Sequence, residues 1–199
     1  MDYGRDARRF YRQCGRCHLV FVPPAFRLST AAEKAYYDLH ENHPGDPGYR
    51  RFLTRLFEPM CQRIAAPARG LDFGSGPGPT LSVMFAAAGY DMAIYDPYYA
   101  PDTHVLTGSY DFVTATEVVE HLDAPGLVLA QILGLVRSGG YLGLMTKLVI
   151  SREAFARWHY KHDPTHICFF SRETFSWWAR QVGCEVTFIG SDVILLLKP

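Results

Sequence analysis

Three closely spaced glycines stand where a short apolar run meets a helical pattern, in the segment LDFGSGPGPT. Gly74, Gly76 and Gly78 permit positive φ angles, so the backbone amides of this loop can approach a ligand at a helix N-terminus. Asp72 precedes the loop, and Asp96 ends the next predicted strand. A carboxylate at that second position can accept hydrogen bonds from both hydroxyls of a ribose. The pattern therefore indicates a site for an adenosine-type ligand.

Two other interpretations of this loop are weaker. Pro79 occupies the place of the third glycine in a G-x-G-x-x-G dinucleotide fingerprint, and no Lys-Ser or Lys-Thr pair follows to make a phosphate-binding P-loop. A nicotinamide-dependent oxidoreductase is therefore disfavoured. The glycines could also serve only a tight connection between a strand and a helix.

Histidines and acids that could move a proton or hold a metal follow the next two predicted strands. Glu117, Glu120 and His121 end the first of them, and the segment WHYKHDPTHICFF, which contains His166, follows the second. Imidazole titrates near neutrality, so His166 or His121 could take a proton from an acceptor hydroxyl. With Glu117 and Glu120 the two histidines could instead bind Mg²⁺ or Mn²⁺, although imidazole is a poor ligand for Mg²⁺. The alternative is structural, with the histidines buried and hydrogen-bonded.

A cysteine pair lies near the N-terminus. In FYRQCGRCHLVFV, Cys14 and Cys17 sit in a turn between two predicted strands, which looks like half of a zinc ribbon. A structural zinc needs four ligands, and none of the other candidates has a diagnostic spacing. These candidates are His18, His40, His43 and Cys61. The alternative is a vestigial hairpin with two reduced thiols.

Two regions that differ in amino-acid composition and pattern must position these residues. Residues 1–68 are charged, aromatic and turn-rich, and they predict a ribbon-like hairpin with a helical cap. Within them, apolar spacing from Tyr49 to Ile64 predicts an amphipathic helix, and Pro59 predicts a kink or break near Glu58. Residues 69–199 alternate short apolar runs with helical patterns, which is typical of a parallel α/β sheet.

Length and composition limit the classes of function. The 199 residues give room for one domain with a small appendage, and 48% hydrophobic residues are ordinary for a globular protein. Twenty Lys and Arg balance twenty Asp and Glu, which argues against a nucleic-acid binder or a polybasic membrane anchor. The N-terminus lacks the apolar region of a secretory signal, and five cysteines form no disulfide framework. We therefore expect a cytoplasmic protein with no nucleic-acid or membrane partner.

The motifs together resemble the class I S-adenosylmethionine-dependent methyltransferases. D-x-G-x-G-x-G and the acid after the second strand match their cofactor motifs; YDFVTATEVVEHL resembles their fourth motif and SGGYLGLMT their fifth strand. The resemblance covers about residues 69–199. HDPTHICFFSRETFSWW is further similar to a bacterial subgroup related to ubiquinone-type O-methyltransferases. The fold implied is a Rossmann-like α/β sheet of seven strands, the last antiparallel and the third rudimentary, with helices on both faces.

The resemblance also implies roles for single residues toward S-adenosylmethionine. Asp96 would hold the ribose, and Thr116 and Glu117 would lie beside the cofactor. The methionine part would lie against Asp72, Gly74, Ser75, Gly76 and Gly78. Residues 97–109 are too few for the usual adenine-contacting segment, so Pro97 and the two tyrosines after it could stack on the adenine instead.

The implied reaction is methyl transfer to an oxygen or nitrogen of a small-molecule acceptor. An alternative is a catalytically silent cofactor-binding or scaffold protein, which the shortened segment 97–109 favours. A second is RNA methylation, because Glu117–His121 with a later histidine is similar to the metal site of small-RNA 2′-O-methyltransferases. Zero net charge weakens this alternative. The sequence leaves the acceptor and the oligomeric state open.

Overall fold

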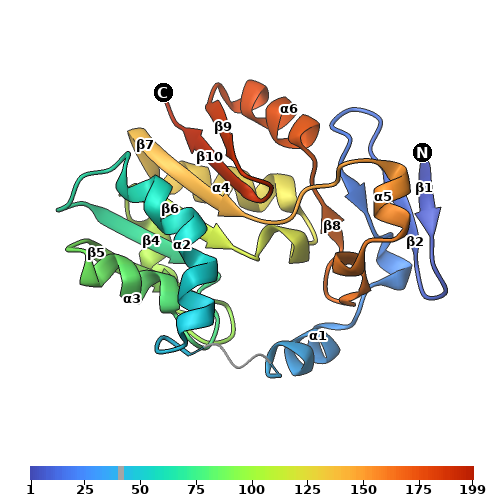
Figure 1. The fold of residues 1–199 in the computed structure, drawn as a ribbon, viewed down its shortest axis with the longest axis horizontal. Helices are drawn as coiled ribbons and strands as arrows, with labels where there is room; N and C mark the ends of the chain where they lie inside the picture. Colours follow the sequence, from blue (N-terminus) through green and yellow to red (C-terminus); the bar gives the residue numbers. More distant parts are fainter. Residues whose placement is uncertain (40–42) are drawn as a thin grey trace.

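Two sheets organise the chain in a computed structural model that describes residues 1–39 and 43–199 (Figure 1). The larger sheet has six strands in the order β5-β4-β6-β7-β10-β9. Their bounds are β4 (Arg69–Phe73), β5 (Asp91–Tyr95), β6 (Tyr110–Thr116), β7 (Val136–Met145), β9 (Glu185–Ile189) and β10 (Val193–Leu197). The first four run parallel, and β10 is antiparallel to both β7 and β9. The predicted mostly parallel sheet with a reversed last strand is confirmed.

The expectation of seven strands is wrong: within residues 1–39 and 43–199 the sheet has six, and the rudimentary third strand is the one that does not form. Between β5 and β6 the chain turns back at once through a bridge between Asp96 and Ala100. It then forms only a short 3-10 helix, η2 (Thr103–Thr107). A parallel strand needs a crossover of a dozen or more residues in addition to its own length. Residues 97–109 cannot supply both, so β5 is left as the edge of the sheet.

Helices cover both faces of this sheet, as predicted (Figure 1). On one face α2 (Pro47–Cys61) and α3 (Thr80–Ala87) pack on Phe112 and Met145. On the other, α4 (Pro125–Leu135) and α6 (Arg172–Val182) share a core with Val113 and Leu144. Successive side chains of a strand point to opposite faces, so each central strand contributes to both cores.

Of the kink or break expected near Glu58, the break is wrong, because α2 continues through Pro59 to Cys61. A proline costs about 3 kcal/mol inside a helix because it removes one hydrogen bond and crowds the preceding turn. Burial opposes that cost, since Leu56 and Met60 are fully buried against the sheet. Gly143 permits this close approach: a Cβ atom there would lie 2.9 Å from the Met60 sulfur.

The N-terminal segment forms a second, four-stranded sheet in the order β1-β2-β3-β8. Three strands come from the start of the chain and the fourth from residues that follow β7 of the larger sheet. They are β1 (Asp2–Arg5), β2 (Phe10–Gln13), β3 (Val20–Phe21) and β8 (Cys168–Phe169). Contacts therefore cross the predicted boundary between residues 1–68 and 69–199; the division itself stays a prediction.

Short elements complete the fold around the end of the larger sheet. After β3 come η1 (Pro24–Phe26) and α1 (Thr30–Tyr37), and after β6 comes η3 (Val119–His121). Between β7 and β8 lie α5 (Arg152–Ala156) and η4 (His159–His162). Among the described helices, none combines the length and the apolar character needed to cross a membrane.

Candidate active site

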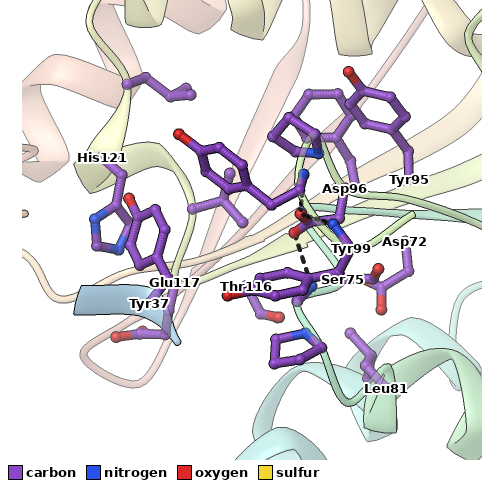
Figure 2. Close-up of a pocket in the computed structure, with 18 of the residues that line it drawn as sticks. Tyr37, Asp72, Ser75, Leu81, Tyr95, Asp96, Tyr99, Thr116, Glu117 and His121 are labelled. Atoms are coloured by element: carbon purple, nitrogen blue, oxygen red, sulfur yellow. Dashed lines mark hydrogen bonds between the residues drawn. The ribbon is translucent and has the colours of Figure 1, made fainter. Parts of the chain in front are cut away.

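A cavity of about 720 Å³ lies at the carboxyl ends of β4, β5 and β6, with α1 on its far side. In an open α/β sheet this edge is where ligands bind. Figure 2 shows two groups of side chains around it: Asp72, Ser75 and Asp96 at one end, and Tyr37, Glu117 and His121 at the other. The cavity volume is within the range of small-molecule sites.

The Asp96 carboxylate joins the end of β5 to the glycine loop. Its Oδ2 accepts a hydrogen bond from the Gly76 amide (3.0 Å), and its Oδ1 accepts from the amides of Tyr98 (2.8 Å) and Tyr99 (3.1 Å). Asp96 is buried and lines the cavity. Each carboxylate oxygen offers about two lone pairs, so Asp96 can still accept from a ligand.

Two glycines of the loop adopt conformations that favour glycine. Gly74 has φ +74° and Gly76 has φ +64°. A Cβ atom at Gly74 would lie 2.4 Å from the Val118 side chain, whereas one at Gly76 would meet nothing within 4 Å. Gly74 is therefore required for packing, and Gly76 keeps open space beside its amide. The described lining of the cavity includes Gly74 to Pro77 but not Gly78.

Ser75, between these glycines, carries a buried hydroxyl without a partner among the described residues. A buried polar atom that lacks a hydrogen bond costs free energy. Ser75 lines the cavity, so a polar ligand there would satisfy its hydroxyl.

Asp72 lies beneath the loop and is 2% exposed. The Thr114 hydroxyl donates to its Oδ1 (2.9 Å). Burial raises the pKa of Asp72 to about 7, and the charge of Asp96 adds to this, while the Thr114 hydrogen bond opposes it. A buried acid that titrates near neutrality is a frequent feature of functional sites.

At the other end of the cavity, Glu117 leaves β6 in the left-handed region, with φ +52°. Its amide donates to the Met145 carbonyl (2.8 Å), which fixes this turn against β7. The Tyr160 hydroxyl lies against both Glu117 Oε2 (3.2 Å) and Glu120 Oε1. Burial raises the pKa of Glu117 to about 7, and burial together with the Glu117 charge raises the pKa of Glu120.

Burial and mutual repulsion disfavour the ionisation of both acids of this pair. Glu120 is fully buried, and its Oε2 has no partner among the described residues. The one hydroxyl proton of Tyr160 can serve only one carboxylate at a time. The environment therefore favours the protonated form of Glu120, whose pKa is raised by burial and by the neighbouring Glu117 charge.

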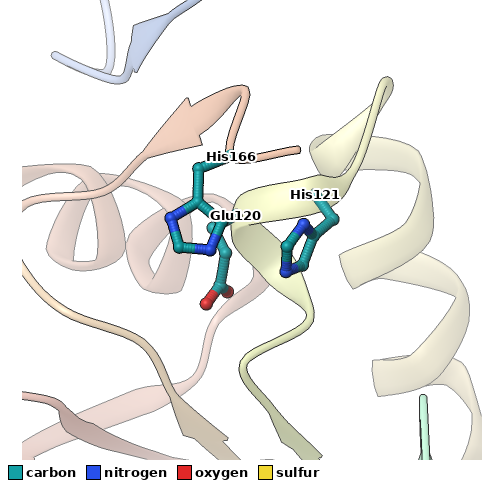
Figure 3. A group of neighbouring side chains, drawn as sticks. All are labelled: Glu120, His121 and His166. Carbon is teal, nitrogen blue, oxygen red and sulfur yellow. The ribbon is translucent and has the colours of Figure 1, made fainter. Parts of the chain in front are cut away.

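The two candidate histidines face the same carboxylate (Figure 3). His121 Nδ1 lies 3.1 Å from the Thr165 carbonyl oxygen, and His166 Nδ1 lies 2.7 Å from the Tyr160 carbonyl oxygen. A carbonyl oxygen only accepts, so both Nδ1 atoms carry protons and donate. In the neutral rings Nε2 is then the basic atom. His166 Nε2 also lies 3.8 Å from Asp163 Oδ2.

Three of the four expected ligands of a divalent ion come together here. The ligand atoms of Glu120, His121 and His166 lie within 4.8 Å of one another. Within residues 1–39 and 43–199 this is the one group of at least three such side chains, and Glu117 is outside it. Two imidazoles with one carboxylate suit Zn²⁺ or Mn²⁺ better than Mg²⁺.

Cys14 and Cys17 do not belong to such a group in the described parts of the chain. His40, one of the expected additional ligands, lies outside the described residues. Amides of Cys17 and Arg16 lower the pKa of the Cys14 thiol, whereas burial raises the pKa of the Cys17 thiol. The zinc site stays a prediction.

The segment after β5 connects the cavity to α1. The Tyr99 hydroxyl donates to Asp38 (2.7 Å), and the Tyr37 and Tyr98 rings are 6.0 Å apart. Pro97, Tyr98 and Tyr99 all line the cavity, as expected for residues near an adenine. Stacking on that base stays a prediction.

Sequence reasoning missed the residues that arrange the His166 loop. Tyr160 contacts both glutamates, and the buried Arg9 donates to the carbonyl oxygens of Asp163 (2.9 Å), Pro164 (3.0 Å) and His166 (2.9 Å). Arg9 comes from the N-terminal hairpin, more than 150 residues earlier. No local spacing could have indicated such a contact; the N-terminal sheet positions the loop.

Comparison with known proteins gives a family for this architecture. A family model described as a methyltransferase domain matches residues 42–188. The comparison with curated proteins gives no match. The ubiquinone-type subgroup is not tested by these results and stays a prediction.

Several solved structures have a similar fold. An O-methyltransferase family protein from Burkholderia thailandensis is 15% identical with a TM-score of 0.57; the match covers 85% of this chain but only 60% of that one. The 1,6-didemethyltoxoflavin-N1-methyltransferase of the same organism, solved with 1,6-didemethyltoxoflavin and S-adenosylhomocysteine, is 15% identical (TM-score 0.57; 96% and 95% covered). Magnesium protoporphyrin IX methyltransferase from Synechocystis, solved with S-adenosylmethionine, is 12% identical (TM-score 0.58; 86% and 92% covered). At these identities the likeness concerns the fold.

Proposed function

The chain belongs to the methyltransferase domain family, and from this premise we propose that it transfers the methyl group of S-adenosylmethionine to an oxygen or nitrogen of a small molecule. One observation carries the proposal: a single cavity contains the glycine loop with Asp96 at one end and basic imidazoles at the other. Neighbours in the fold that hold S-adenosylhomocysteine or S-adenosylmethionine support the choice of cofactor. Those named for 1,6-didemethyltoxoflavin and magnesium protoporphyrin IX support a small acceptor.

The residues at the glycine-loop end fit this cofactor. The orphaned Ser75 hydroxyl needs a polar partner, and the space beside Gly76 is open to a ligand. Asp96 would accept from the ribose, and Asp72 with Gly74, Ser75 and Gly76 would hold the methionine part. Thr116, Glu117 and Pro97 would complete the contacts, since each lines the cavity.

The bound cofactor would supply an electrophilic methyl group on a sulfonium, so the protein's own task is alignment, exclusion of water and proton removal. On transfer, an acceptor lone pair would form the bond to the methyl carbon, and the electrons of the carbon–sulfur bond would stay on sulfur. The acceptor proton passes to His166 Nε2, which is basic because Nδ1–H donates to the Tyr160 carbonyl. His121, oriented in the same way by Thr165, is the neighbouring candidate.

A divalent ion between Glu120, His121 and His166 is a second role for the same side chains, favoured by their spacing. We give precedence to proton transfer because Tyr160 already contacts the Glu120 carboxylate. No metal is needed to activate a sulfonium.

Two measurements test the function. Calorimetry with S-adenosylhomocysteine tests the cofactor site, and formation of S-adenosylhomocysteine from S-adenosylmethionine with an acceptor panel tests turnover. Binding without any turnover would identify a silent cofactor-binding protein, the alternative that the missing strand between β5 and β6 favours. Absence of binding would overturn the proposal.

A further inference from the structure

The charged side chains around the cavity have one sign. Six carboxylates line it, and no Lys or Arg is among the described lining residues. The six are Glu33, Asp72, Asp96, Glu117, Asp123 and Asp163. Asp72 and Asp96 lie at the end assigned to the cofactor, and Asp123 is paired with Arg27 (2.6 Å). Three carboxylates therefore remain for the other end.

Within the described residues, none of these three forms an ion pair with Lys or Arg. Glu33 Oε1 accepts from the Tyr37 hydroxyl (2.9 Å), and Asp163 Oδ1 accepts from the Thr165 amide (2.8 Å). Lys147 and Arg55 act on the Glu117 charge from outside the described lining. No Lys or Arg of the described lining therefore neutralises Glu33 or Asp163, and the basic group nearest to Asp163 is His166, whose Nε2 lies 3.8 Å from Asp163 Oδ2.

Tyr37 lies beside these acids. Its hydroxyl donates to Glu33, and its ring lies 5.3 Å from the His121 ring, in an edge-to-face arrangement, and 6.0 Å from the Tyr98 ring. The face of a tyrosine attracts a cation, and carboxylates make charge-assisted hydrogen bonds to an ammonium group. A lining with six carboxylates and no Lys or Arg among its described residues therefore favours a cation over an anion.

We propose that the methyl acceptor is a small planar molecule that carries an ammonium group, held by Glu33 and Asp163 against the Tyr37 ring. The inference rests on the proposed function, because it assigns the acceptor to the end of the cavity that the cofactor does not use. Glu33 is a specificity-determining residue, and carboxylate- or phosphate-bearing molecules are excluded as acceptors.

The experiment uses two sets of probes that share a ring and differ in charge: phenethylamine, ethylbenzene and phenylacetate, and tryptamine, 3-ethylindole and indole-3-acetate. Calorimetry measures their binding to protein saturated with S-adenosylhomocysteine. In at least one set the amine should bind about tenfold or more tighter than the neutral probe, and the acids should not bind. Glu33→Gln should weaken amine binding about tenfold to a hundredfold, and Glu33→Lys should reverse the preference. Glu58→Gln, an exposed acid on α2, is the control.

Equal binding of acids and amines, no binding by either amine, or an amine preference unchanged in Glu33→Lys would overturn the inference. Asp163→Asn is the second variant, and its hydrogen bond to Thr165 is kept by the amide oxygen. Each variant is first titrated with S-adenosylhomocysteine alone. If the wild type binds S-adenosylhomocysteine but shows no charge preference among the probes, only this inference is overturned. If the wild type does not bind S-adenosylhomocysteine, the proposed function is overturned.

Discussion

A hydrogen bond of 3.0 Å joins Gly76 to Asp96, and it connects the loop after β4 to the end of β5. The amides of Tyr98 and Tyr99 hold the other oxygen of the same carboxylate. Asp96 therefore has two functions in the fold: it sets the shape of the glycine loop, and it presents a charge to whatever occupies the cavity.

Asp96→Ala should weaken S-adenosylhomocysteine binding about tenfold to a hundredfold, because a hydrogen bond to a charged group contributes about 1.5–3 kcal/mol. Asp96→Asn should bind S-adenosylhomocysteine with an affinity between those of the wild type and Asp96→Ala, because its amide oxygen still accepts a hydrogen bond. Calorimetry gives the dissociation constants, and Asp91→Ala, an exposed aspartate on the same strand, is the control. An Asp96→Ala protein with wild-type affinity would remove Asp96 from the cofactor site.

The stability of the ligand-free protein should depend on pH through Asp72. Burial raises its folded pKa from 3.8 to about 7, so the folded state favours the protonated acid. Its contribution to the free energy of unfolding is complete below about pH 4 and is lost as the pH rises to about 7, on the order of 4 kcal/mol. Glu117 acts in the same direction because its pKa is also raised to about 7.

Asp72→Asn should remove the Asp72 part of this slope while keeping an acceptor for Thr114. Denaturant unfolding at several pH values checks this: relative to wild type, the variant should gain stability between about pH 4 and about pH 8. Asp91→Asn should leave the slope unchanged. If the free energy of unfolding changed with pH in the same way for the wild type and Asp72→Asn, Asp72 would not titrate in this range.

The sequence was informative where structure is local or repetitive. Strands β4 and β6 and the second half of β7 contain short apolar runs because most of their residues are buried, and the glycine loop is set by backbone conformation at Gly74 and Gly76. The motifs also singled out Asp72, Asp96, Glu117 and His166, and all four line one cavity.

Contacts between distant segments were beyond such reasoning. Arg9 reaches the carbonyls around His166 only because β3 pairs with β8. From local sequence alone, Pro59 favours the end of a helix. Only the structure shows that Leu56 and Met60 are buried against the sheet, which opposes that tendency. The acidic character of the cavity likewise depends on the position of α1, because Glu33 of α1 joins Asp163 in the same lining.

The cysteine pair should carry little metal. Two thiolates alone do not close a structural zinc site, and no third ligand joins them among the described residues. Metal analysis should give well below one zinc per chain, and a chelator should leave the melting temperature unchanged. Cys14 should react with a thiol reagent faster than Cys17, because its thiol pKa is lowered while that of Cys17 is raised. One equivalent of zinc, lost together with Cys14→Ser, would instead establish a metal site.

His166→Ala distinguishes proton transfer from metal binding at the acceptor end. As the proton acceptor, His166 should contribute about 10²–10⁴-fold to turnover, and its loss should leave S-adenosylhomocysteine affinity intact. His162→Ala, an exposed histidine in η4, is the control.

If these side chains instead hold a metal, activity should require added Mn²⁺ and should fall when a chelator is added. Glu120→Gln and His121→Ala should then lower turnover as much as His166→Ala, because the three residues would act as one ligand set. We expect no response to chelator, since the Tyr160 hydroxyl already contacts Glu120. Wild-type turnover by His166→Ala on the best acceptor would exclude both roles and leave His166 as a packing residue beneath Tyr160.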